Sequence, residues 1–297
     1  MRYLGLTLLL MSALADAAQV PQVQRPTAQL PTAAEPRADD RILVVAPHPD
    51  DETLCCAGYI RRALAAGAAV GVVWMTAGDG FEVDALLVEH HLRLKGRGMQ
   101  RLGQTRVTEA FAAAQLLGIV QGQRWMLGYP DRGLSALLST NLDQPYTSAY
   151  TRTAQISYPQ ALSSGAAFTG RNLTHDLQKV IEDFAPTRVL VSAPEDLHPD
   201  HAAAGRLVRQ VLEARGKPWE LWYYVIHAKH WPQPRGLHRD VELVPPPLVA
   251  GRHWQVFNLT AAEQDAKLEA LGAHQTQTEV MKGFLESFVR RNELFAF

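Results

Sequence analysis

Cysteine is scarce in this chain of 297 residues: there are only two, Cys55 and Cys56, and they are adjacent. This number excludes a fold held together by many disulfides, and a zinc site made of cysteines would need a second pair elsewhere. Neighbouring residues rarely reach disulfide geometry. The sequence therefore predicts two small thiols buried on a helix.

Net charge is also nearly absent. The 29 Lys and Arg residues balance 30 Asp and Glu residues, which leaves a formal charge of -1. A general nucleic-acid-binding protein needs an excess of cations to displace counterions from the phosphate backbone. The charge balance therefore predicts that nucleic acid is not a partner of this protein.

Long apolar runs are missing as well. The run Leu4 to Leu14 is about 11 residues long, and no later run reaches the roughly 18 residues of a membrane-spanning helix. Arg2 precedes this run and the small residues Ala15-Asp16-Ala17-Ala18 follow it, which is typical of a secretory signal peptide. We expect residues 1–18 to be removed on export to the periplasm or the extracellular space, leaving no transmembrane segment.

The remaining chain divides into a leader and a domain. Residues 19–40 are rich in Pro, Ala, Gln and Thr without periodicity, which predicts a flexible leader. Residues 41–297 are expected to form a single domain. Within it, residues 135–170 are too long for an ordinary connection, so they are either a functional loop or a partly ordered insertion.

Short β-branched runs alternate with helical patterns along this domain. The alternation predicts an α/β, Rossmann-like layered domain with a mostly parallel sheet and helices on both faces. Thr260 and Glu263 form a capping-box pattern at the start of the last predicted helix. The predicted strands are 41–46, 69–75, 125–127, 188–192 and 221–226, and the predicted helices are 52–66, 106–117, 173–184, 199–214 and 260–272.

Two polar motifs follow predicted strands. Ala46-Pro47-His48-Pro49-Asp50-Asp51-Glu52 follows the first strand, and Glu195-Asp196-Leu197-His198-Pro199-Asp200-His201 follows the strand that ends at Ser192. Open α/β sheets bind ligands beyond the carboxyl ends of their strands. We therefore expect both motifs at the same edge of one sheet.

The residue types in these motifs suit a metal. Imidazole nitrogens and carboxylate oxygens are ligands of hydrolytic zinc, which takes three from the protein and a water in the fourth position. Taken alone, each His-Pro-Asp segment also fits a loop closed by an Asx turn. Two such motifs after two strands of one sheet favour a metal site at the carboxyl edge.

The two motifs carry a family resemblance. His48-Pro-Asp-Asp-Glu52 with His198-Pro-Asp-His201 resembles the zinc-dependent N-acetylglucosaminyl deacetylases, also known as LmbE-like or PIG-L-like deacetylases. This family includes deacetylases of the mycothiol and bacillithiol pathways and the enzyme that deacetylates N-acetylglucosaminyl-phosphatidylinositol. The resemblance extends from Arg41 to about Gln277.

The resemblance implies a zinc ion bound by His48, Asp51 and His201. It also implies Asp50 as the general base and His198 as the residue that stabilises the oxyanion. Adjacent carboxylates cannot easily both turn onto one metal, so one binds it while its neighbour faces the attacking water. Asp200 either orients the His198 imidazole or caps the following helix.

Weaker similarities extend the resemblance. Arg106 and Glu109 resemble the family's Arg-x-x-Glu, in which the Arg reaches substrate, and Asp131 resembles an Asp that accepts sugar hydroxyls. The alternatives are a surface Arg-Glu pair and a turn Asp. Because neither Arg106 nor Asp131 belongs to a metal motif, we expect both to bind substrate away from the reacting amide. A further family pattern, without an assigned role, comprises Lys267, His274 and Gln277.

The reaction implied is removal of the acetyl group of an N-acetylated amino sugar by a water bound to zinc. The partner is then a small or oligosaccharide N-acetyl sugar, and the sequence predicts no oligomeric state. Two other classes are a metal-dependent phosphoesterase, which would want more cationic contacts and often a second metal, and a non-catalytic sugar-binding module. His227 and His230, close in sequence to several Trp and Tyr residues, either line a sugar site or pack in the core.

Overall fold

The computed structural model describes residues 27–81, 95–216, 219–247 and 251–297. The predicted signal peptide lies outside these residues. The strands are β1 (Arg41–Ala46), β2 (Ala69–Thr76), β3 (Arg124–Tyr129), β4 (Arg188–Ser192), β5 (Glu220–Tyr224), β6 (Trp254–Asn258) and β7 (Asn292–Ala296). The α-helices are α1 (Asp51–Ala65), α3 (Arg97–Leu116), α4 (Leu134–Leu137), α5 (Gly170–Phe184), α6 (Pro199–Arg215), α7 (Ala261–Ala273) and α8 (Gln275–Glu286).

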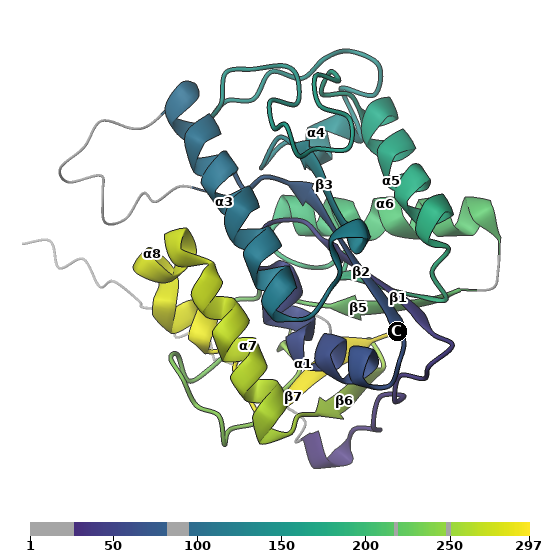
Figure 1. Cartoon of the computed structure of the whole chain (residues 1–297), viewed down its shortest axis with the longest axis vertical. Coiled ribbons are helices and arrows are strands. Elements are labelled where there is room, and N and C mark those ends of the chain that lie inside the picture. Colours follow the sequence, from purple (N-terminus) through teal and green to yellow (C-terminus); the bar gives the residue numbers. More distant parts are fainter. Residues whose placement is uncertain (1–26, 82–94, 217–218, 248–250) are drawn as a thin grey trace, which may run out of the picture.

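In the described part of the chain, the strands form one seven-stranded sheet in the order β3-β2-β1-β4-β5-β7-β6 (Figure 1). The five strands from β3 to β5 are parallel, whereas β7 runs antiparallel to both β5 and β6. The chain builds outward from β1 to β3, then returns to place β4 on the other side of β1. This reversal between β1 and β4 is the point at which open α/β sheets bind ligands.

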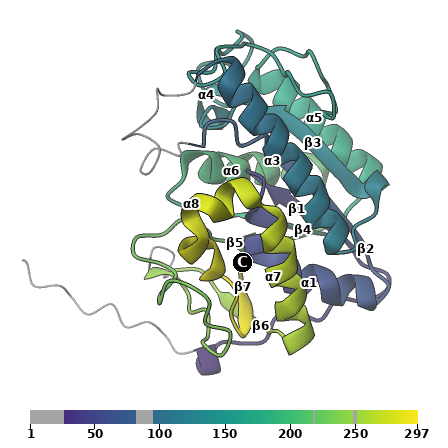
Figure 2. The ribbon, with the colours of Figure 1, turned by 60° about the vertical axis from the view of Figure 1, so that its left-hand side comes forward.

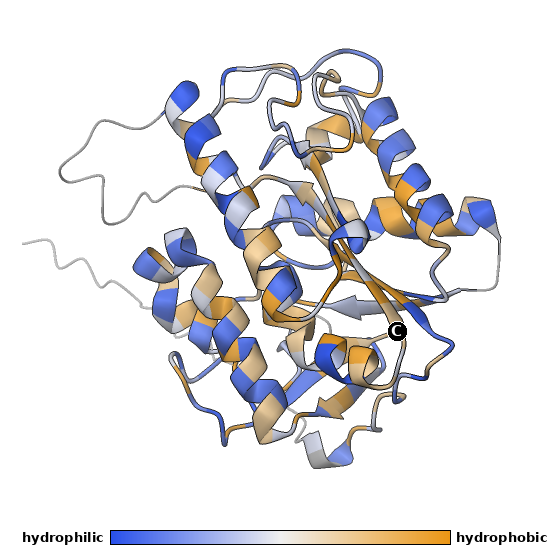
Figure 3. Ribbon diagram, in the orientation of Figure 1, coloured by the Kyte–Doolittle hydropathy of each residue, from blue (hydrophilic) through white to orange (hydrophobic). Residues whose placement is uncertain are grey.

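Helices cover both faces of the sheet, as the sequence predicts. On one face α7 packs against α1 and α3, and on the other α5 packs against α6 (Figure 2). The central strands are apolar along their length, and the outer sides of α5 and α7 are polar (Figure 3). Every residue of β1 after Arg41 is buried, because a parallel strand covered on both faces has no solvated side.

The predicted helices and parallel strands are present with shifted ends. The largest shift is in α3, which begins at Arg97 rather than at residue 106. Glycine weakens a helical pattern, and the added segment contains Gly103. A Cβ on Gly103 would lie 2.3 Å from the hydroxyl oxygen of Tyr158, so the missing side chain permits this close approach. The Thr260–Glu263 capping box opens α7 as predicted.

Strands β6 and β7 and helix α8 were not predicted from the sequence. Strand β7 begins Asn292-Glu293, two polar residues that do not look like a buried strand, yet both are buried. The carboxylate of Glu293 is satisfied by Lys267 Nζ at 2.8 Å and by two backbone N–H groups of α1. Partners distant in sequence therefore stabilise a strand whose local pattern is unfavourable.

The predicted leader and insertion are both partly structured where they are described. Residues 27–40 lie against the domain: Ala33 is buried and its N–H donates to the Val256 carbonyl at 2.8 Å. Residues 135–170 contain most of α4 and the first residue of α5, and have no other regular element. Bridges from Ala161 to Met126 of β3 and from Gln155 to Ala167 order this insertion, and its Tyr158 and Phe168 side chains are buried.

The expectation of two separate thiols is wrong. Cys55 and Cys56 are joined in a disulfide within α1, and both are buried as predicted. The adjacency that argued against pairing also keeps the two sulfurs within reach of one another. None of the described helices combines the length and the apolar character that crossing a bilayer requires.

Candidate metal centre and active site

The two polar motifs meet at the carboxyl edge of the sheet. β1 and β4 pair in parallel, with Val45 opposite Val191, so the segments that follow them leave the sheet side by side. The first segment opens α1 with Asp51, and the second opens α6 with Pro199. The structure thereby brings together residues that are about 150 positions apart in the sequence.

Three side-chain atoms converge at this edge. His48 Nδ1 lies 3.2 Å from His201 Nε2 and 3.4 Å from Asp51 Oδ2. His201 Nε2 lies 3.2 Å from the same Asp51 oxygen. All three residues are buried.

This triplet fits a tetrahedral metal ion. Metal–ligand bonds of about 2.0–2.2 Å at tetrahedral angles place the ligand atoms about 3.3–3.6 Å apart, close to the three distances between these atoms. Two imidazoles and one carboxylate are also the donor set of mononuclear catalytic zinc sites. Other possible metal-binding groups among the described residues share His48 or His201: His48/His198/His201, Asp196/His201/His227 and His48/Asp131/Asp200.

Carboxylates stand behind His48. Its other ring nitrogen, Nε2, lies 3.1 Å from Asp131 Oδ1 and 3.4 Å from Asp200 Oδ2. Metal-binding histidines almost always donate their second ring N–H to such a group, which fixes the tautomer and ring orientation. Burial by itself lowers the pKa of His48, but the Asp131 charge and these hydrogen bonds raise it well above its ordinary value.

Asp196 lies behind His201 in the corresponding position, and no role for Asp196 was predicted from the sequence. Its Oδ2 lies 3.5 Å from His201 Nδ1, and its side chain is fully buried. Backbone N–H groups of His198, Ile226 and His227 donate to the two carboxylate oxygens at 2.9–3.0 Å. The segments that follow β4 and β5 therefore both hold the Asp196 carboxylate in place.

Asp50 lies at the start of α1 in a strained conformation. Its φ of 115° is in the left-handed region, which non-glycine residues rarely adopt outside functional sites. Arg106 Nη2 lies 3.5 Å from its Oδ2. Burial, followed by the charge of Asp51, raises the pKa of Asp50 to about 7, while Arg106 opposes the rise. A carboxyl group with this pKa can exchange protons near neutral pH.

His198 is the half-buried residue that precedes α6. Its Nδ1 accepts the backbone N–H of Asp200 at 3.2 Å, which leaves Nε2 to carry the hydrogen of a neutral ring. Burial, followed by the charges of His48 and His201, lowers the pKa of His198 to about 2. The ring therefore remains a neutral hydrogen-bond donor.

The Asp200 side chain neither orients the His198 imidazole nor caps α6, the two roles predicted for it. The His198 side chain itself caps α6. The Asp200 carboxylate instead accepts the backbone N–H groups of Arg132 at 2.5 Å and Leu134 at 3.0 Å. Asp200 thus fixes the loop after β3 that contains Asp131.

Arg106 and Asp131 are also placed differently from the prediction. Arg106 is 3% exposed and donates to the carbonyls of Gly78 at 2.7 Å and Pro49 at 2.9 Å, so it braces two loops beside Asp50. Asp131 contacts His48, and it also accepts the Gly80 N–H at 3.0 Å. The expectation that neither residue belongs to the metal cluster is wrong for Asp131, because the loop after β3 reaches His48 in the loop after β1.

Lys267, His274 and Gln277, the family pattern without an assigned role, form hydrogen bonds to α1 and to the loop before it. Lys267 donates to the Leu54 carbonyl at 2.7 Å, and Gln277 donates to the Pro49 carbonyl at 3.0 Å. His274 Nε2 lies 3.2 Å from a carboxylate oxygen of the buried Glu52. These contacts attach α7 and α8 to α1 and to the loop before it, which carries Asp50.

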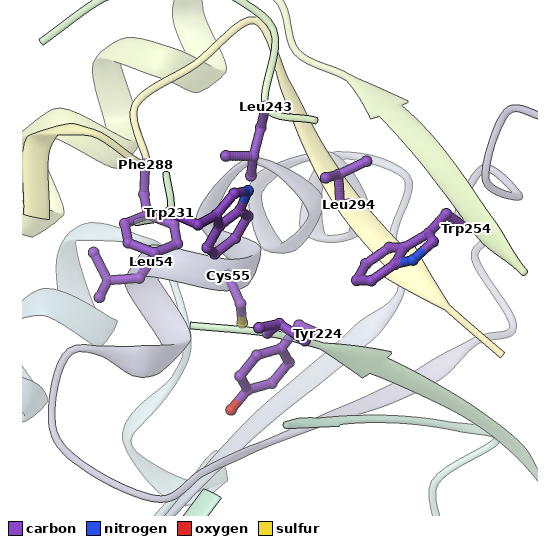
Figure 4. A pocket seen from close by; sticks show the side chains of 9 residues that line it. Leu54, Cys55, Tyr224, Trp231, Leu243, Trp254, Phe288 and Leu294 are labelled. Atoms are coloured by element: carbon purple, nitrogen blue, oxygen red, sulfur yellow. The ribbon is translucent and has the colours of Figure 1, made fainter. Parts of the chain in front are cut away.

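The aromatic residues near His227 divide into two groups. Tyr224 and Trp231 are buried and line a small apolar pocket between α1 and the antiparallel strands, together with Trp254 (Figure 4). They belong to the core. The His227 side chain, in contrast, is 34% exposed, and its ring centroid lies 4.5 Å from that of His201. His227 is thus part of the metal centre's surroundings.

The chain is similar in sequence and in fold to known proteins. A 1D-myo-inositol 2-acetamido-2-deoxy-alpha-D-glucopyranoside deacetylase of Rhodococcus opacus (strain B4) is 29% identical over 269 residues, which cover 82% of this chain and 83% of that protein. The structure of an N,N'-diacetylchitobiose deacetylase from Pyrococcus horikoshii has a TM-score of 0.52 and 20% identity, covering 88% of this chain and 85% of that one. A conserved protein from Thermus thermophilus has a TM-score of 0.50 and 22% identity, covering 84% of each chain.

The two solved structures share the fold described above. The model of the PIG-L family, described as GlcNAc-PI de-N-acetylase, matches residues 43–212. This match covers more than half of the chain and contains both His-Pro-Asp motifs. On that basis the protein belongs to the PIG-L family of de-N-acetylases.

Proposed function

We propose that this protein is an exported, zinc-dependent hydrolase that removes the acetyl group from an N-acetylated amino sugar of the N-acetylglucosamine type. The observation that carries the proposal is the convergence of His48, Asp51 and His201 at tetrahedral spacing. Zinc is favoured because two imidazoles and one carboxylate suit it, and because carboxylates stand behind both imidazoles.

When bound, zinc acts as a Lewis acid toward water and toward the acetamide carbonyl. Asp50 accepts a proton from the attacking water and returns it to the departing amine nitrogen. Its pKa of about 7 allows both transfers near neutral pH. The Nε2–H group of His198 donates a hydrogen bond to the carbonyl oxygen as negative charge develops there.

The substrate class follows from the relatives. The Rhodococcus protein is named for a 2-acetamido-2-deoxyglucopyranoside, and the Pyrococcus protein for N,N'-diacetylchitobiose. Both names describe N-acetylated glucosamine units. For an exported protein, such units occur in cell-wall sugars, polysaccharides and secreted glycoconjugates.

The proposal that the protein is exported rests on the sequence of residues 2–18 alone. Arg2, the apolar run and the small residues after it support a cleaved signal peptide. Intact-mass measurement of protein from the native host should give a mature chain that begins near Gln19. Cytosolic protein that retains Met1 would contradict export without affecting the proposed chemistry.

The proposed activity is tested by metal analysis of the purified protein together with acetate release from a panel of N-acetyl sugars. We expect about one zinc ion per chain and acetate as the product. Phosphate release from sugar phosphates without acetate would favour a phosphoesterase. Sugar binding without either product would favour a non-catalytic binding module.

A further inference from the structure

A line of side chains in contact connects the candidate metal centre to the surface. The ring of His227, beside His201, is stacked with that of Phe284 at 6.2 Å between centroids and 29° between planes. The guanidinium carbon of Arg235 lies 4.6 Å from the centroid of Phe284. His227 and Phe284 are both partly exposed, and Arg235 is exposed, so the line borders solvent.

Hydrogen bonds to the residues on either side of Arg235 hold it in this place. The N–H of Gly236 donates to the carbonyl of Gly283, the neighbour of Phe284, at 2.7 Å. On the other side, the buried Arg290 donates to the carbonyls of Pro234 and His238. The segment that carries Arg235 is therefore bonded to α8 through Gly236, and to Arg290 after α8 through Pro234 and His238.

The guanidinium itself lacks an acidic partner among the residues that the structure describes. Two other cations near this region are paired: Lys282 of α8 with Glu286 at 3.8 Å, and the half-buried Arg239 with Asp265 at 2.6 Å. Arg235 instead has a cation–π contact with Phe284. This contact orients the planar group and leaves its N–H edges able to bind a carboxylate or phosphate in bidentate fashion.

We propose that Arg235 is a specificity-determining residue that binds an anionic group on the substrate. The substrate is then an N-acetylated amino sugar with a carboxylate or phosphate beyond the acetamide that reacts at the metal centre. This inference rests on the proposed deacetylase function and narrows its substrate class. His227 and Phe284 form the side of the site that lies between the reacting group and the anion.

The test compares Arg235→Gln with the wild-type protein on three substrates. They are a neutral methyl glycoside of N-acetylglucosamine, N-acetylglucosamine 1-phosphate and N-acetylmuramic acid, which carries a carboxylate. We expect the wild type to favour one anionic substrate over the glycoside by at least tenfold in kcat/KM. In Arg235→Gln this ratio should fall to about one, because KM for the anionic substrate rises. The anionic substrate whose KM rises shows whether the residue binds phosphate or carboxylate.

Two further variants separate recognition from general charge and from folding. Lys282→Gln removes one exposed positive charge from the adjacent helix and should keep the wild-type ratio. Phe284→Leu removes the ring beneath the guanidinium and should lower the ratio in part. High salt should also reduce the preference, because an exposed ion pair is screened. The inference would be overturned if Arg235→Gln and Lys282→Gln lost the preference for the anionic substrate equally. It would also be overturned if the wild type had no such preference.

Calorimetric titration with glucosamine 1-phosphate and with muramic acid separates this inference from the proposed function. If the wild type releases no acetate from any substrate, the proposed function fails. Binding of one of these amines that weakens at least tenfold in Arg235→Gln would still support the anion site. Binding of neither amine, or equal binding by both proteins, would overturn it.

Discussion

Asp131 Oδ1 lies 3.1 Å from Nε2 of His48, on the side of the imidazole opposite His201 and Asp51. The contact connects the loop after β3 with the loop after β1. Asp131 therefore belongs to the candidate metal centre through its contact with His48. The contact leads to the first of five predictions.

Asp131→Ala should weaken metal binding by about 10- to 100-fold, the range found when the carboxylate behind a metal-binding histidine is removed. Competition with a chelator of known affinity measures the change. Asp143→Ala, in the insertion of residues 135–170 and exposed beside its ion-pair partner Arg171, is the matched control and should bind metal like the wild type. Unchanged affinity in Asp131→Ala would leave Asp131 with the role of binding substrate alone.

His48→Ala and His201→Ala should each lose the metal, because each removes one of three protein ligands. Elemental analysis of the purified variants gives the occupancy. His175, exposed on α5, provides a control histidine whose replacement by Ala should leave about one metal per chain. Full occupancy in both His48→Ala and His201→Ala would refute the ligand assignment.

Asp50→Asn keeps the shape of the side chain but removes the proton acceptor. Turnover should fall by roughly 10²- to 10⁴-fold, the contribution of general acid–base catalysis, while the metal stays bound. Steady-state kinetics and metal analysis on the same preparation measure the turnover and the bound metal. A kcat equal to that of the wild type would mean that another group takes the proton.

Arg106→Ala should lower kcat/KM by at least tenfold, or about 1.4 kcal/mol. The guanidinium braces the carbonyls of Pro49 and Gly78 beside Asp50, so its loss lets the base move. Metal content should be unchanged, because Arg106 touches none of the three ligands in the structure. Retention of wild-type efficiency would show that the loops keep their places without it.

Asp79 provides a prediction for the pH dependence of stability. Burial raises its pKa to about 7 from an ordinary value of 3.8, although the hydrogen bond from Tyr158 and the charge of Arg106 oppose the rise and the charge of Asp131 adds to it. Between these values the folded protein holds a proton that the unfolded chain has lost. The free energy of unfolding therefore falls as pH rises through this window, by up to about 1.4 kcal/mol per pH unit.

Asp79→Asn cannot titrate, so it lacks this contribution. The stability of Asp79→Asn relative to the wild type should increase between pH 5 and pH 8. Urea denaturation at the two pH values measures the difference. A relative stability that stays constant, or that decreases, would contradict the raised pKa.

The sequence by itself determined the alternating α/β architecture, because β-branched runs and helical periodicity are local signals that the parallel strands and most helices obey. It also placed both polar motifs at one edge, since parallel strands end on the same side of a sheet. His48, Asp51 and His201 meet there as the motif resemblance implied. Local pattern was sufficient for these parts of the protein.

Only the tertiary structure decided the surroundings of that centre. Asp196 and Asp131 take their places behind the two imidazoles because loops from different strands fold against each other, and no spacing in the sequence encodes such contacts. The same holds for β7, whose Glu293 is stabilised by Lys267 from α7. Buried polar groups gain their stability from partners distant in the chain, so their roles follow from the packing and not from the local pattern.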